Sequence, residues 1–563
     1  MFWKKIKKHF RKQETEIHPD EIFLDSRNLP EFDTYQFEGR IERPISTRMH
    51  VFIGAVFLLI ALVFLSRLVY LQINKGEILR SLSENNRLRH SYIFAERGVV
   101  YDRRDKLMAW NASHPEGEQF SIRQYTDAAG VSLLLGYVKY PGKDSAGFYY
   151  SDQYDGKDGV EKYFNAELSG KNGLKIIETD AVGRVVSENI IDPPVSGKTL
   201  HLSIDSELSE AFFVEIEKLA LEIGFKGGAA AIMDITNGEV VAMTSYPEYS
   251  SDVLSQGKDK KTIESFINDG NNPFLDRLSR GLYTPGSIIK PFIAIAALAE
   301  GVIDPSKKIV STGSITLPNI YDETKSTVFR DWKAHGAVDM REAIAVSSDV
   351  YFYEIGGGYE EQKGLGITLI DKYMRLFGFG RELPVPYFGG MAGTIPNPKW
   401  KAENFEGEEW TVGNTYHTSI GQYGFLVTPM QALVATAAVA NNGRIVYPEI
   451  LKGVTSGESG QIDLDKSYFE VAKDGMRLSV VIGTASALNV PYVKFAGKTG
   501  TAELGAAKQY VNSWVTGFFP YDEPKYAFVV IMEKGPRANT VGASAVARRF
   551  FDWASIYRPD LFE

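Results

Sequence analysis

The sequence predicts a membrane-anchored protein with two globular parts, a β-rich domain followed by an α+β domain. Three observations carry this prediction. An apolar run of membrane length covers residues 49–71, and short strand-type segments follow between residues 72 and 195. Beyond residue 196, helical segments gather in the middle of the sequence, with hairpin-type strands before and after them. This order favours an α+β domain over repeated βαβ units.

Length and composition limit the function classes. At 563 residues the chain is too long for one core, and about three or four domains are expected. A hydrophobic content of 44% and a charged content of 24% are typical of folded chains. The net charge of −9 argues against a nucleic-acid-binding protein. The absence of cysteine excludes disulfides, a thiolate nucleophile and cysteine metal ligands.

The apolar run is predicted to be a transmembrane helix. Met49–Ser66 lies between Arg48 and Arg67 and contains no Asp, Glu, Lys or Arg, and Leu68–Leu71 extends it beyond Arg67. About 20 apolar residues span a bilayer. A buried core helix is the alternative, whereas a cleaved signal peptide would begin near residue 1 and be shorter.

The first 12 residues include six cations, which predict the orientation of the helix: Lys4, Lys5, Lys7, Lys8, Arg11 and Lys12. By the positive-inside rule, residues 1–48 form a cytoplasmic tail and the chain after the anchor lies on the other side of the membrane. The acidic segment Asp20–Glu42 has no apolar period, so it is interpreted as a tail or a partner-binding strip.

Residues 72–195 are interpreted as a separate β-rich domain. Val99–Tyr101, Phe120–Ile122 and Lys175–Ile177 are predicted to be short strands. Asp180–Asp192 is interpreted as a polar connection that carries Val and Ile. Pro193, Pro194 and Gly197 then mark a domain boundary near residue 195.

The domain over residues 196–563 begins with alternating and helical patterns. Thr199–Ile204 predicts a strand that enters this domain, and Ser206–Gly224 predicts a helix. Gly228–Met233 and Glu239–Thr244 predict a hairpin around an Asn-Gly turn. Further predicted elements are the helix Pro429–Ala440, the strands Val511–Phe518 and Tyr526–Glu533, and the helix Ser544–Ile556.

A Ser-x-x-Lys motif stands at the start of an apolar helix predicted to run to Gly301. Ser287 and Lys290 are three residues apart and therefore share a helix face. A serine hydroxyl becomes a good nucleophile when a neighbouring base takes its proton, and lysine can be that base when its pKa is lowered. The Ser287 N–H can donate to a developing oxyanion. For this motif alone, an incidental Ser and Lys at a buried helix start is the alternative.

A second motif, Ser347–Asp349, follows the predicted helix Met340–Val346. Ser347 could relay a proton between Lys290 and a leaving amine. Asp349 could position the substrate or hold Lys290. A helix cap is the competing interpretation of the motif.

The third motif, Lys498–Gly500, is predicted to lie where a strand ends in small residues. Lys498 supplies a second cation for a substrate carboxylate and helps to lower the pKa of Lys290. The hydroxyls of Thr499 and Thr501 can bind the same carboxylate, and the Thr501 N–H could complete an oxyanion hole.

Gly500 in this motif and Gly497 just before it let a peptide approach the strand and pair along it. A phosphate-binding loop is excluded, because that loop needs a glycine at the position of Tyr492.

Together the three motifs match the serine acyl-transfer set of penicillin-binding proteins. Further segments resemble class B penicillin-binding proteins over residues 50–555: Glu96–Arg103, Gly159–Glu161, Gly170, Gly173, Asp234–Ala242, Ser419–Gln422 and Thr428–Pro429. No stretch resembles a glycosyltransferase domain. These further segments, outside the three motifs, argue against a soluble β-lactamase. The resemblance implies an antiparallel sheet flanked by helices, a helical subdomain, and a non-catalytic pedestal domain over residues 72–195.

The resemblance also implies a peptidoglycan D,D-transpeptidase that cross-links stem peptides through an acyl-serine and binds penicillin covalently. The implied catalytic residues are Ser287, Lys290, Ser347 and Lys498, and the implied substrate-binding residues are Asp349, Thr499, Gly500 and Thr501. No cofactor is implied. The implied partners are stem peptides, β-lactam antibiotics, a membrane glycosyltransferase and the lipid bilayer, with no nucleic acid.

Within class B, Asp349 in place of Asn resembles the elongation-type members, which maintain cell shape. A division-type (septal) transpeptidase, a D,D-carboxypeptidase, a β-lactam sensor and a non-catalytic scaffold are the alternatives. Some elongation-type members hold zinc with Asp, His and Cys. This chain has Asp322, Asp331 and His335 near the second motif but no cysteine, so we predict no metal site.

Overall fold

The computed structural model describes residues 46–80, 88–113, 119–143, 149, 151–179, 185–319, 322–454, 459–505 and 507–563. The chain divides into two compact units, residues 1–89 with 178–186, and residues 90–177 with 187–563. The basic N-terminus and the acidic segment at residues 20–42 lie outside the described residues.

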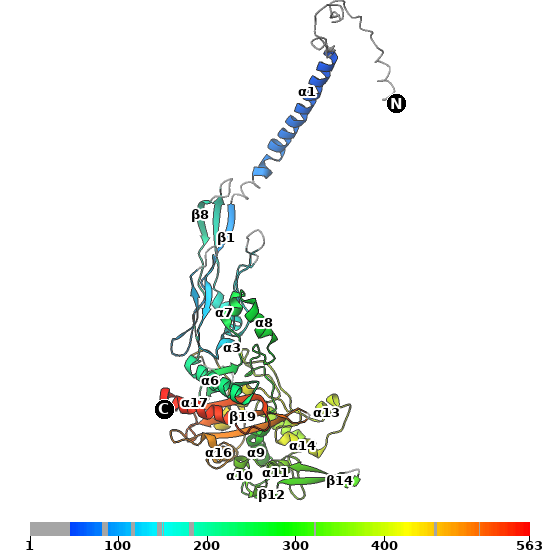
Figure 1. Ribbon diagram of the computed structural model, residues 1–563, viewed down its shortest axis with the longest axis vertical. Coiled ribbons are helices and arrows are strands. Elements are labelled where there is room, and N and C mark those ends of the chain that lie inside the picture. Colours follow the sequence, from blue (N-terminus) through cyan, green and yellow to red (C-terminus); the bar gives the residue numbers. More distant parts are fainter. Residues whose placement is uncertain are drawn as a thin grey trace, which may run out of the picture. The chain divides into compact units, whose positions relative to one another are not determined.

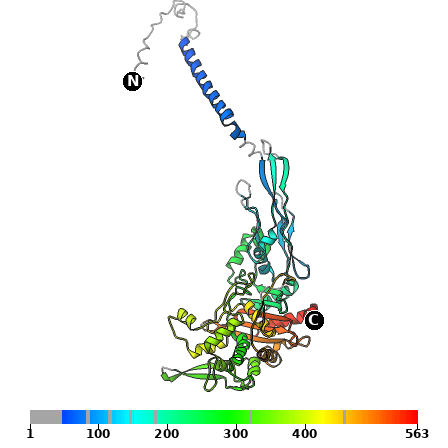
Figure 2. The ribbon, with the colours of Figure 1, turned by 180° about the vertical axis from the view of Figure 1, so that it is seen from behind.

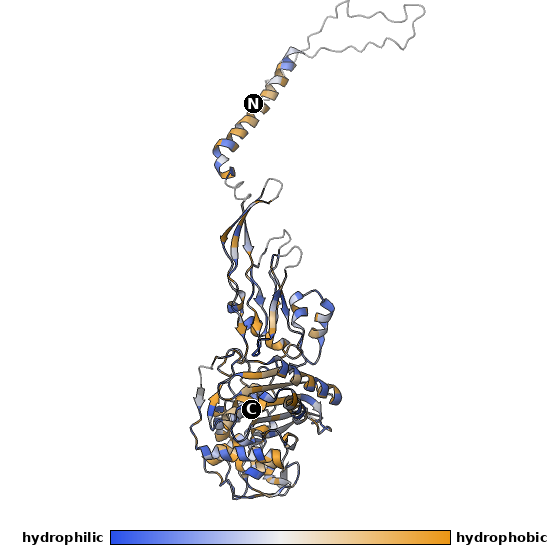
Figure 3. Cartoon of the chain, turned by 90° about the vertical axis from the view of Figure 1, so that its left-hand side faces the viewer, coloured by the Kyte–Doolittle hydropathy of each residue, from blue (hydrophilic) through white to orange (hydrophobic). Residues whose placement is uncertain are grey.

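The predicted anchor is one long helix. Helix α1 (Thr47–Val69) continues into the π-helical turn η4 (Tyr70–Asn74), which gives an apolar helix of 28 residues with none buried in the protein. Hydrophobic residues occur along the length of this helix in Figure 3. A helix of this length and composition can cross a bilayer, and its exposed apolar surface argues against a buried core helix.

We call the described residues 88–202 the pedestal region and residues 203–563 the C-terminal region. The pedestal region contains three sheets, with strand orders β1-β7-β8, β4-β3-β2-β9 and β5-β6. Its elements are β1 (Leu88–Ile93), β2 (Val100–Tyr101), β3 (Leu107–Ala112), β4 (Ile122–Tyr125), α3 (Ser132–Leu135), β5 (Val138–Lys139), β6 (Asp155–Gly156), α4 (Gly159–Tyr163), α5 (Asn165–Ser169), β7 (Gly173–Thr179), β8 (Val185–Asp192) and β9 (Leu200–His201).

The predicted β-rich character is confirmed, but three details were wrong. The segment expected to be a polar connection contains strand β8, because its β-branched residues pair in a sheet although their side chains stay exposed. The strand expected over Phe120–Ile122 begins only at Ile122. The strand expected over Thr199–Ile204 is the short β9, which pairs in parallel with β2 of the pedestal region.

A buried charge cluster holds the pedestal region together. The Glu161 carboxylate accepts hydrogen bonds from Arg97 Nε at 2.6 Å and from Arg123 Nε at 2.7 Å, and all three side chains are almost fully buried. Burial acts to raise the pKa of Glu161, but Arg123 and Arg97 together hold it below its usual range. The cluster joins two of the segments that carried the family resemblance, around Arg97 and Glu161.

The C-terminal region is built around a five-stranded antiparallel sheet in the order β11-β10-β20-β19-β18. Its strand β19 is labelled in Figure 1. Its strands are β10 (Gly227–Asp234), β11 (Val240–Tyr246), β18 (Ala496–Leu504), β19 (Tyr510–Phe519) and β20 (Tyr526–Pro536). The predicted hairpin and the two predicted late strands are therefore confirmed.

Side chains of the sheet alternate between two cores. On β20, Phe528 and Val530 belong to one core, which also includes Phe212 of α6 (Ser206–Ile223) and Phe550 of α17 (Ala543–Tyr557). Val529 and Ile531 belong to the other core. This is the two-residue period of a strand buried on both faces. Figures 1 and 2 show α17, in red, beside the orange strands from both sides.

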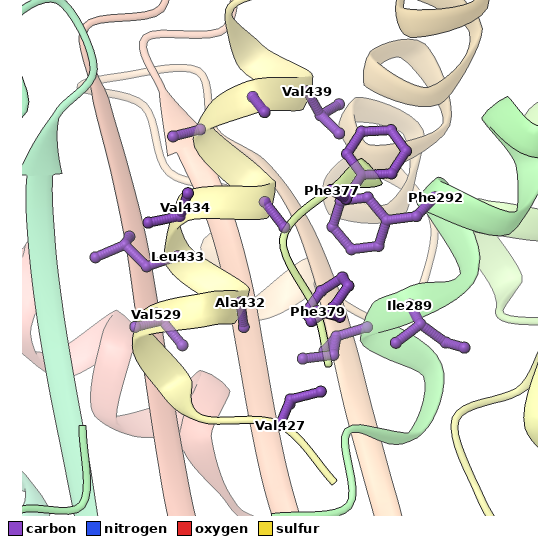
Figure 4. Packing of buried hydrophobic residues seen from close by; sticks show 14 of the residues in the cluster. Ile289, Phe292, Phe377, Phe379, Val427, Ala432, Leu433, Val434, Val439 and Val529 are labelled. Carbon is purple, nitrogen blue, oxygen red and sulfur yellow. The ribbon is translucent and has the colours of Figure 1, made fainter. Parts of the chain in front are cut away.

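The second core lies between the sheet and a group of helices. Figure 4 shows α15 (Pro429–Ala440) lying across the strands, with Leu433 on the same side as Val529 and Phe292 close to Phe377. The ring centroids of Phe292 and Phe377 are 4.9 Å apart. This packing fixes α9 (Lys290–Ala299), which carries Phe292, against the rest of the region.

The remaining elements of the C-terminal region complete its helical layer, two small sheets and an outer hairpin. They are α7 (Ser251–Gln256), α8 (Lys260–Asn268), η5 (Gly286–Ile289), β12 (Ile309–Ser311), β13 (Ser314–Asn319), β14 (Asp322–Arg330), β15 (Gly336–Val338), α10 (Met340–Val346), α11 (Asp349–Gly357), α12 (Gly366–Leu376), α13 (Pro398–Asn404), α14 (Val412–Ser419), β16 (Arg444–Val446), β17 (Ser459–Gln461), α16 (Lys466–Val481), η6 (Ser486–Leu488) and η7 (Pro559–Phe562).

Side-chain hydrogen bonds tie the pedestal region to the C-terminal region. Asp102 Oδ2 accepts from Ser206 Oγ at 2.8 Å, at the start of α6. The Glu248 carboxylate accepts from the N–H of Gly130 at 2.6 Å and from that of Ser132 at 2.8 Å. Burial raises the pKa of Glu248 to about 7 although these hydrogen bonds oppose the shift.

This shift predicts a pH-dependent stability at the junction. Unfolded Glu248 loses its proton near its ordinary pKa of 4.5, whereas the folded protein keeps the proton up to about pH 7. The contribution of Glu248 to stability is therefore complete below pH 4.5 and falls as the pH rises to 7, by at most about 3 kcal/mol. We expect the wild type to lose stability between pH 5 and about pH 7 relative to Glu248→Gln, measured by thermal unfolding in detergent. Parallel profiles of the two proteins would contradict this.

Candidate functional site

Ser287 lies in a tight turn that is pressed against the edge of the sheet. It belongs to the 3-10 turn η5, which continues directly into α9, so the helix predicted from Ser287 begins as a 3-10 turn. Gly286 has a φ of +58°, and a Cβ on it would lie 3.0 Å from the carbonyl oxygen of Thr501. A Cβ on Gly500 would lie 2.7 Å from the carbonyl oxygen of Pro285. Glycine on both sides therefore lets the turn rest directly on β18.

The Ser287 side chain is partly exposed, and no described residue makes a hydrogen bond with its hydroxyl. The N–H groups of a first helical turn have no acceptor inside their own helix. The Ser287 N–H is thus placed where a developing oxyanion can use it.

Lys290 is completely buried one helical turn after Ser287. Its Nζ donates to the Ser347 carbonyl oxygen at 2.8 Å, to Ser347 Oγ at 3.3 Å and to Asp349 Oδ1 at 2.6 Å. It also lies 5.4 Å from the ring centroid of Phe352. The first and second motifs, 57 residues apart in the sequence, therefore meet at one ammonium group.

Ser347 is held in an unusual backbone conformation between α10 and α11, with a φ of +59°. Its Oγ accepts a hydrogen bond from Lys498 Nζ at 2.9 Å as well as the one from Lys290. A hydroxyl has two acceptor lone pairs and one proton. Because both lone pairs face ammonium groups, the Ser347 proton is available for donation to a third group.

Lys498 is also fully buried, and its Nζ donates to the Thr499 carbonyl oxygen at 3.0 Å. Burial, and next the charge of Lys290, lower the pKa of Lys498 well below its usual value, while Asp349 opposes the shift. Burial likewise raises the pKa of Asp349, against the effect of Lys290. Two lysines and one carboxylate thus share a site of low solvent access, and perturbed pKa values of this kind are typical of functional sites.

The third motif lies on a free sheet edge. Strand β18 begins at Ala496 and continues through the motif to Leu504, so the prediction that the strand ends at the motif was wrong. The small residues pack against the Ser287 turn and do not terminate the strand, because β19 pairs with β18 along its whole length. The other side of β18 has no neighbouring strand among the described residues, which leaves an edge on which an extended peptide can pair.

Sequence reasoning missed Thr484, which supports this strand. Thr499 Oγ1 donates to Thr484 Oγ1 at 2.6 Å, and the Thr484 N–H donates to the Ala345 carbonyl oxygen at 3.2 Å. Thr484 therefore links the third motif to the helix that precedes Ser347. A threonine in a short loop gives no local sequence signal for this role.

Trp332 and Ser348 were also missed, although the neighbouring Asp331 was considered as a metal ligand. The buried Asp331 carboxylate accepts hydrogen bonds from Ser348 Oγ at 2.9 Å and from the Val350 N–H at 3.0 Å, which fixes the turn of the second motif. Trp332 donates from Nε1 to the Val346 carbonyl oxygen at 3.2 Å and leaves 57% of its surface exposed beside Ser347. The available sequence signal for these roles was that Asp331 and Trp332 are adjacent and precede the second motif.

The described residues contain no group of three or more His, Asp or Glu side chains able to hold a metal ion. His335 Nε2 lies 3.4 Å from Asp331 Oδ1, and burial lowers the pKa of His335 although Asp331 opposes this. The side chain of Asp322, the third residue considered for zinc, lies outside the described part of the chain.

Two family models match the chain. The penicillin-binding protein transpeptidase domain matches residues 228–552, and the penicillin-binding protein dimerisation domain matches residues 116–202. The first match contains all three motifs and the whole five-stranded sheet except Gly227.

Curated relatives include peptidoglycan D,D-transpeptidases MrdA. The one from Haemophilus influenzae is 31% identical over 67% of this chain and 59% of its own length. The one from Acinetobacter baumannii is 32% identical over 67% of this chain and 57% of its own length. The peptidoglycan D,D-transpeptidase FtsI of Escherichia coli is 24% identical over 67% of this chain and 58% of its own length. The chain thus spans less than two thirds of the length of these three relatives.

Solved structures show the same fold. The structure of Pseudomonas aeruginosa PBP2 in complex with WCK 5153 has a TM-score of 0.68 at 28% identity and covers 82% of this chain and 96% of its own. The complex of PBP2 with MreC from Helicobacter pylori has a TM-score of 0.68 at 25% identity and covers 84% of this chain and 100% of its own.

Proposed function

Because this chain belongs to the penicillin-binding protein transpeptidase family, we propose that it is a serine-dependent peptidoglycan D,D-transpeptidase that cross-links stem peptides. The observation that carries the proposal is the convergence of Lys290, Lys498 and Ser347 beside the turn of Ser287. The three motifs come from distant parts of the sequence, and a structural role alone does not require two buried lysines to share one hydroxyl.

In the first step, Ser287 attacks the penultimate D-alanyl carbonyl carbon of a stem peptide. Lys290 Nζ acts as the general base and takes the Ser287 proton as the Oγ–C bond forms. The N–H groups of Ser287 and Thr501 bind the oxyanion. When the C–N bond breaks, the leaving D-alanine nitrogen receives the Ser347 proton, and Ser347 is reprotonated by Lys290.

In the second step, an amine from a neighbouring stem peptide attacks the acyl-serine. The amine proton passes through Ser347 to Lys290 as the new C–N bond forms, and Lys290 gives a proton to Ser287 Oγ as the C–O bond breaks. The free edge of β18 supports binding of the donor peptide as an added strand, with Thr499, Gly500 and Thr501 along it. Lys498 attracts the carboxylate of the donor, and Asp349 holds Lys290 in place. No cofactor takes part in these steps.

We favour a role in elongation, the branch of the family that includes MrdA, over a role in division. MrdA proteins are 31% and 32% identical to this chain, against 24% for FtsI over the same share of the chain, 67%. Asp349 at the third position of the second motif agrees with this branch. Penicillin and other β-lactams are proposed to acylate Ser287, and a membrane glycosyltransferase of the elongation complex is the proposed partner.

We propose that residues 1–48 form a cytoplasmic tail, residues 49–71 the anchor, residues 72–195 the pedestal domain and residues 196–563 the transpeptidase domain. The two globular domains then lie outside the cytoplasmic membrane. The apolar helix supports a single-pass membrane protein, and the six cations near the N-terminus support this orientation.

The proposed chemistry is tested by covalent labelling of the detergent-solubilised full chain with a fluorescent penicillin, followed by peptide mapping. We expect an adduct on Ser287 that disappears in Ser287→Ala, while Ser265→Ala, which changes an exposed serine of α8 outside the three motifs, keeps Ser287 labelling. A folded wild type that never labels would reject the acyl-serine mechanism and favour a non-catalytic scaffold. Product analysis with stem pentapeptides then separates cross-linking from D,D-carboxypeptidase hydrolysis.

A further inference from the structure

A cavity of about 310 Å³ lies between the pedestal region and the C-terminal region, away from the three motifs. The pedestal region lines it with Asp158, Lys162 and Tyr163 on and before α4, and the C-terminal region lines it with Asp276, Arg280 and Tyr387 among others. This volume is at the small end of the range found for ligand pockets, about 300–1,000 Å³. None of the residues lining it has a role in the proposed transfer reaction.

The two carboxylates of this cavity are already occupied by donors of the protein. Asp158 Oδ2 accepts a hydrogen bond from the Tyr249 hydroxyl at 3.2 Å. Asp276 accepts from the Leu278 N–H at 3.0 Å and from the Ser279 hydroxyl, and burial raises the pKa of Asp276. Arg280 also lies close enough to Asp276 to act against the effect of burial on the pKa of this carboxyl.

The two cationic side chains that line the cavity are Lys162 and Arg280. Lys162 and Arg280 are exposed at the cavity, and neither side chain makes a hydrogen bond or ion pair with any residue that the structure describes. One comes from each region, so an anion between them would bridge the junction. A guanidinium presents a planar fork of donors that matches a carboxylate.

Aromatic side chains form a further part of the cavity. The rings of Tyr163 and Tyr387 meet edge to face across the junction, with centroids 5.7 Å apart. Tyr387 donates from its hydroxyl to the Leu134 carbonyl oxygen at 2.8 Å, which fixes its ring. The cavity thus combines unpaired cations with flat apolar faces, which suits a short peptide that carries carboxylates.

We propose that this cavity binds a carboxylate-bearing segment of a peptidoglycan stem peptide, with the carboxylate between Lys162 and Arg280. The inference rests on the proposed function, because that function places stem peptides around this chain. The site is connected to the nucleophile along the backbone. Arg280 precedes Ser287 by seven residues, and Trp514 Nε1 holds the intervening Thr284 carbonyl oxygen at 3.0 Å.

The test measures peptide binding to the full chain in detergent by calorimetry, in a Ser287→Ala background that cannot be acylated. The probe is a synthetic stem tripeptide with free carboxylates, which lacks the D-alanyl-D-alanine end and cannot act as a donor. We expect it to bind, and its fully amidated form to bind at least tenfold more weakly. Arg280→Ala and Lys162→Ala should each weaken binding at least tenfold, and Lys260→Ala, an exposed lysine of α8, should not.

Both substituted side chains are exposed, so the variants should fold, and their melting temperatures verify this. Absence of binding would overturn the site. Binding that neither Arg280→Ala nor Lys162→Ala weakens would also overturn it and would assign the signal to another part of the chain, such as the free edge of β18. Equal binding of the amidated peptide would overturn the carboxylate as the recognised group. Because the experiment uses Ser287→Ala, its outcome is independent of penicillin labelling, so failure of the site and failure of the proposed chemistry are distinguishable.

Discussion

Lys290→Ala is expected to lower the rate of acylation by a fluorescent penicillin by about 10²–10⁴-fold, the range by which a general base accelerates a reaction. The reason is that Lys290 is the buried amine one helical turn from Ser287, held by Ser347 and Asp349. Removing it leaves the Ser287 hydroxyl without a base. The measurement is the second-order rate constant of acylation for the full chain.

The matched control is Lys494→Ala. Lys494 lies just before β18, pairs with Asp522 at 2.8 Å and is 60% exposed, so its loss should leave the rate of acylation within a factor of two or three. The melting temperature of each variant separates lost chemistry from lost folding. A wild-type rate of acylation in folded Lys290→Ala would reject Lys290 as the base and leave Lys498, with its depressed pKa, as the candidate.

Glu161→Ala is expected to destabilise the pedestal region by about 3–5 kcal/mol, because it leaves buried charges without their partner. Arg97 and Arg123 both donate to Glu161, and their side chains have no measurable exposure. The effect should appear as a loss of hydrogen-exchange protection in β2, β3 and β4 and as a lower unfolding midpoint in urea.

The control for this prediction is Glu167→Ala, which removes an exposed carboxylate from the neighbouring α5 and should cost less than about 1 kcal/mol. The pH dependence gives an independent check. The pKa of folded Glu161 is lowered, so its contribution to stability is present above the ordinary pKa of 4.5 and is lost as the pH falls through the folded pKa. Equal stability of the two variants at neutral pH would show that the charge cluster is not what holds the pedestal region.

The fold was predictable where local patterns are strong. The hairpin of β10 and β11 follows from an Asn-Gly turn between two apolar runs, and α15 follows from an alanine-rich segment closed by Asn441–Gly443. Strand β8 was not predictable, because a strand that buries no face has no alternation to recognise. Strand β9 was expected to enter the second domain, but it pairs with β2, since two paired residues do not specify their partner.

The sequence alone determined the apolar membrane-length helix, the α+β class and the residue types of the three motifs, because periodicity, length and spacing are local properties. Only the tertiary structure decided how these motifs meet. It placed Ser347 Oγ between Lys290 and Lys498, which are 208 positions apart in the numbering, and made Thr484 and Trp332 neighbours of the same turn. It also brought Lys162 and Arg280 to one cavity. Contacts of this kind depend on how helices and sheet pack, and packing joins residues whose separation in the sequence carries no signal.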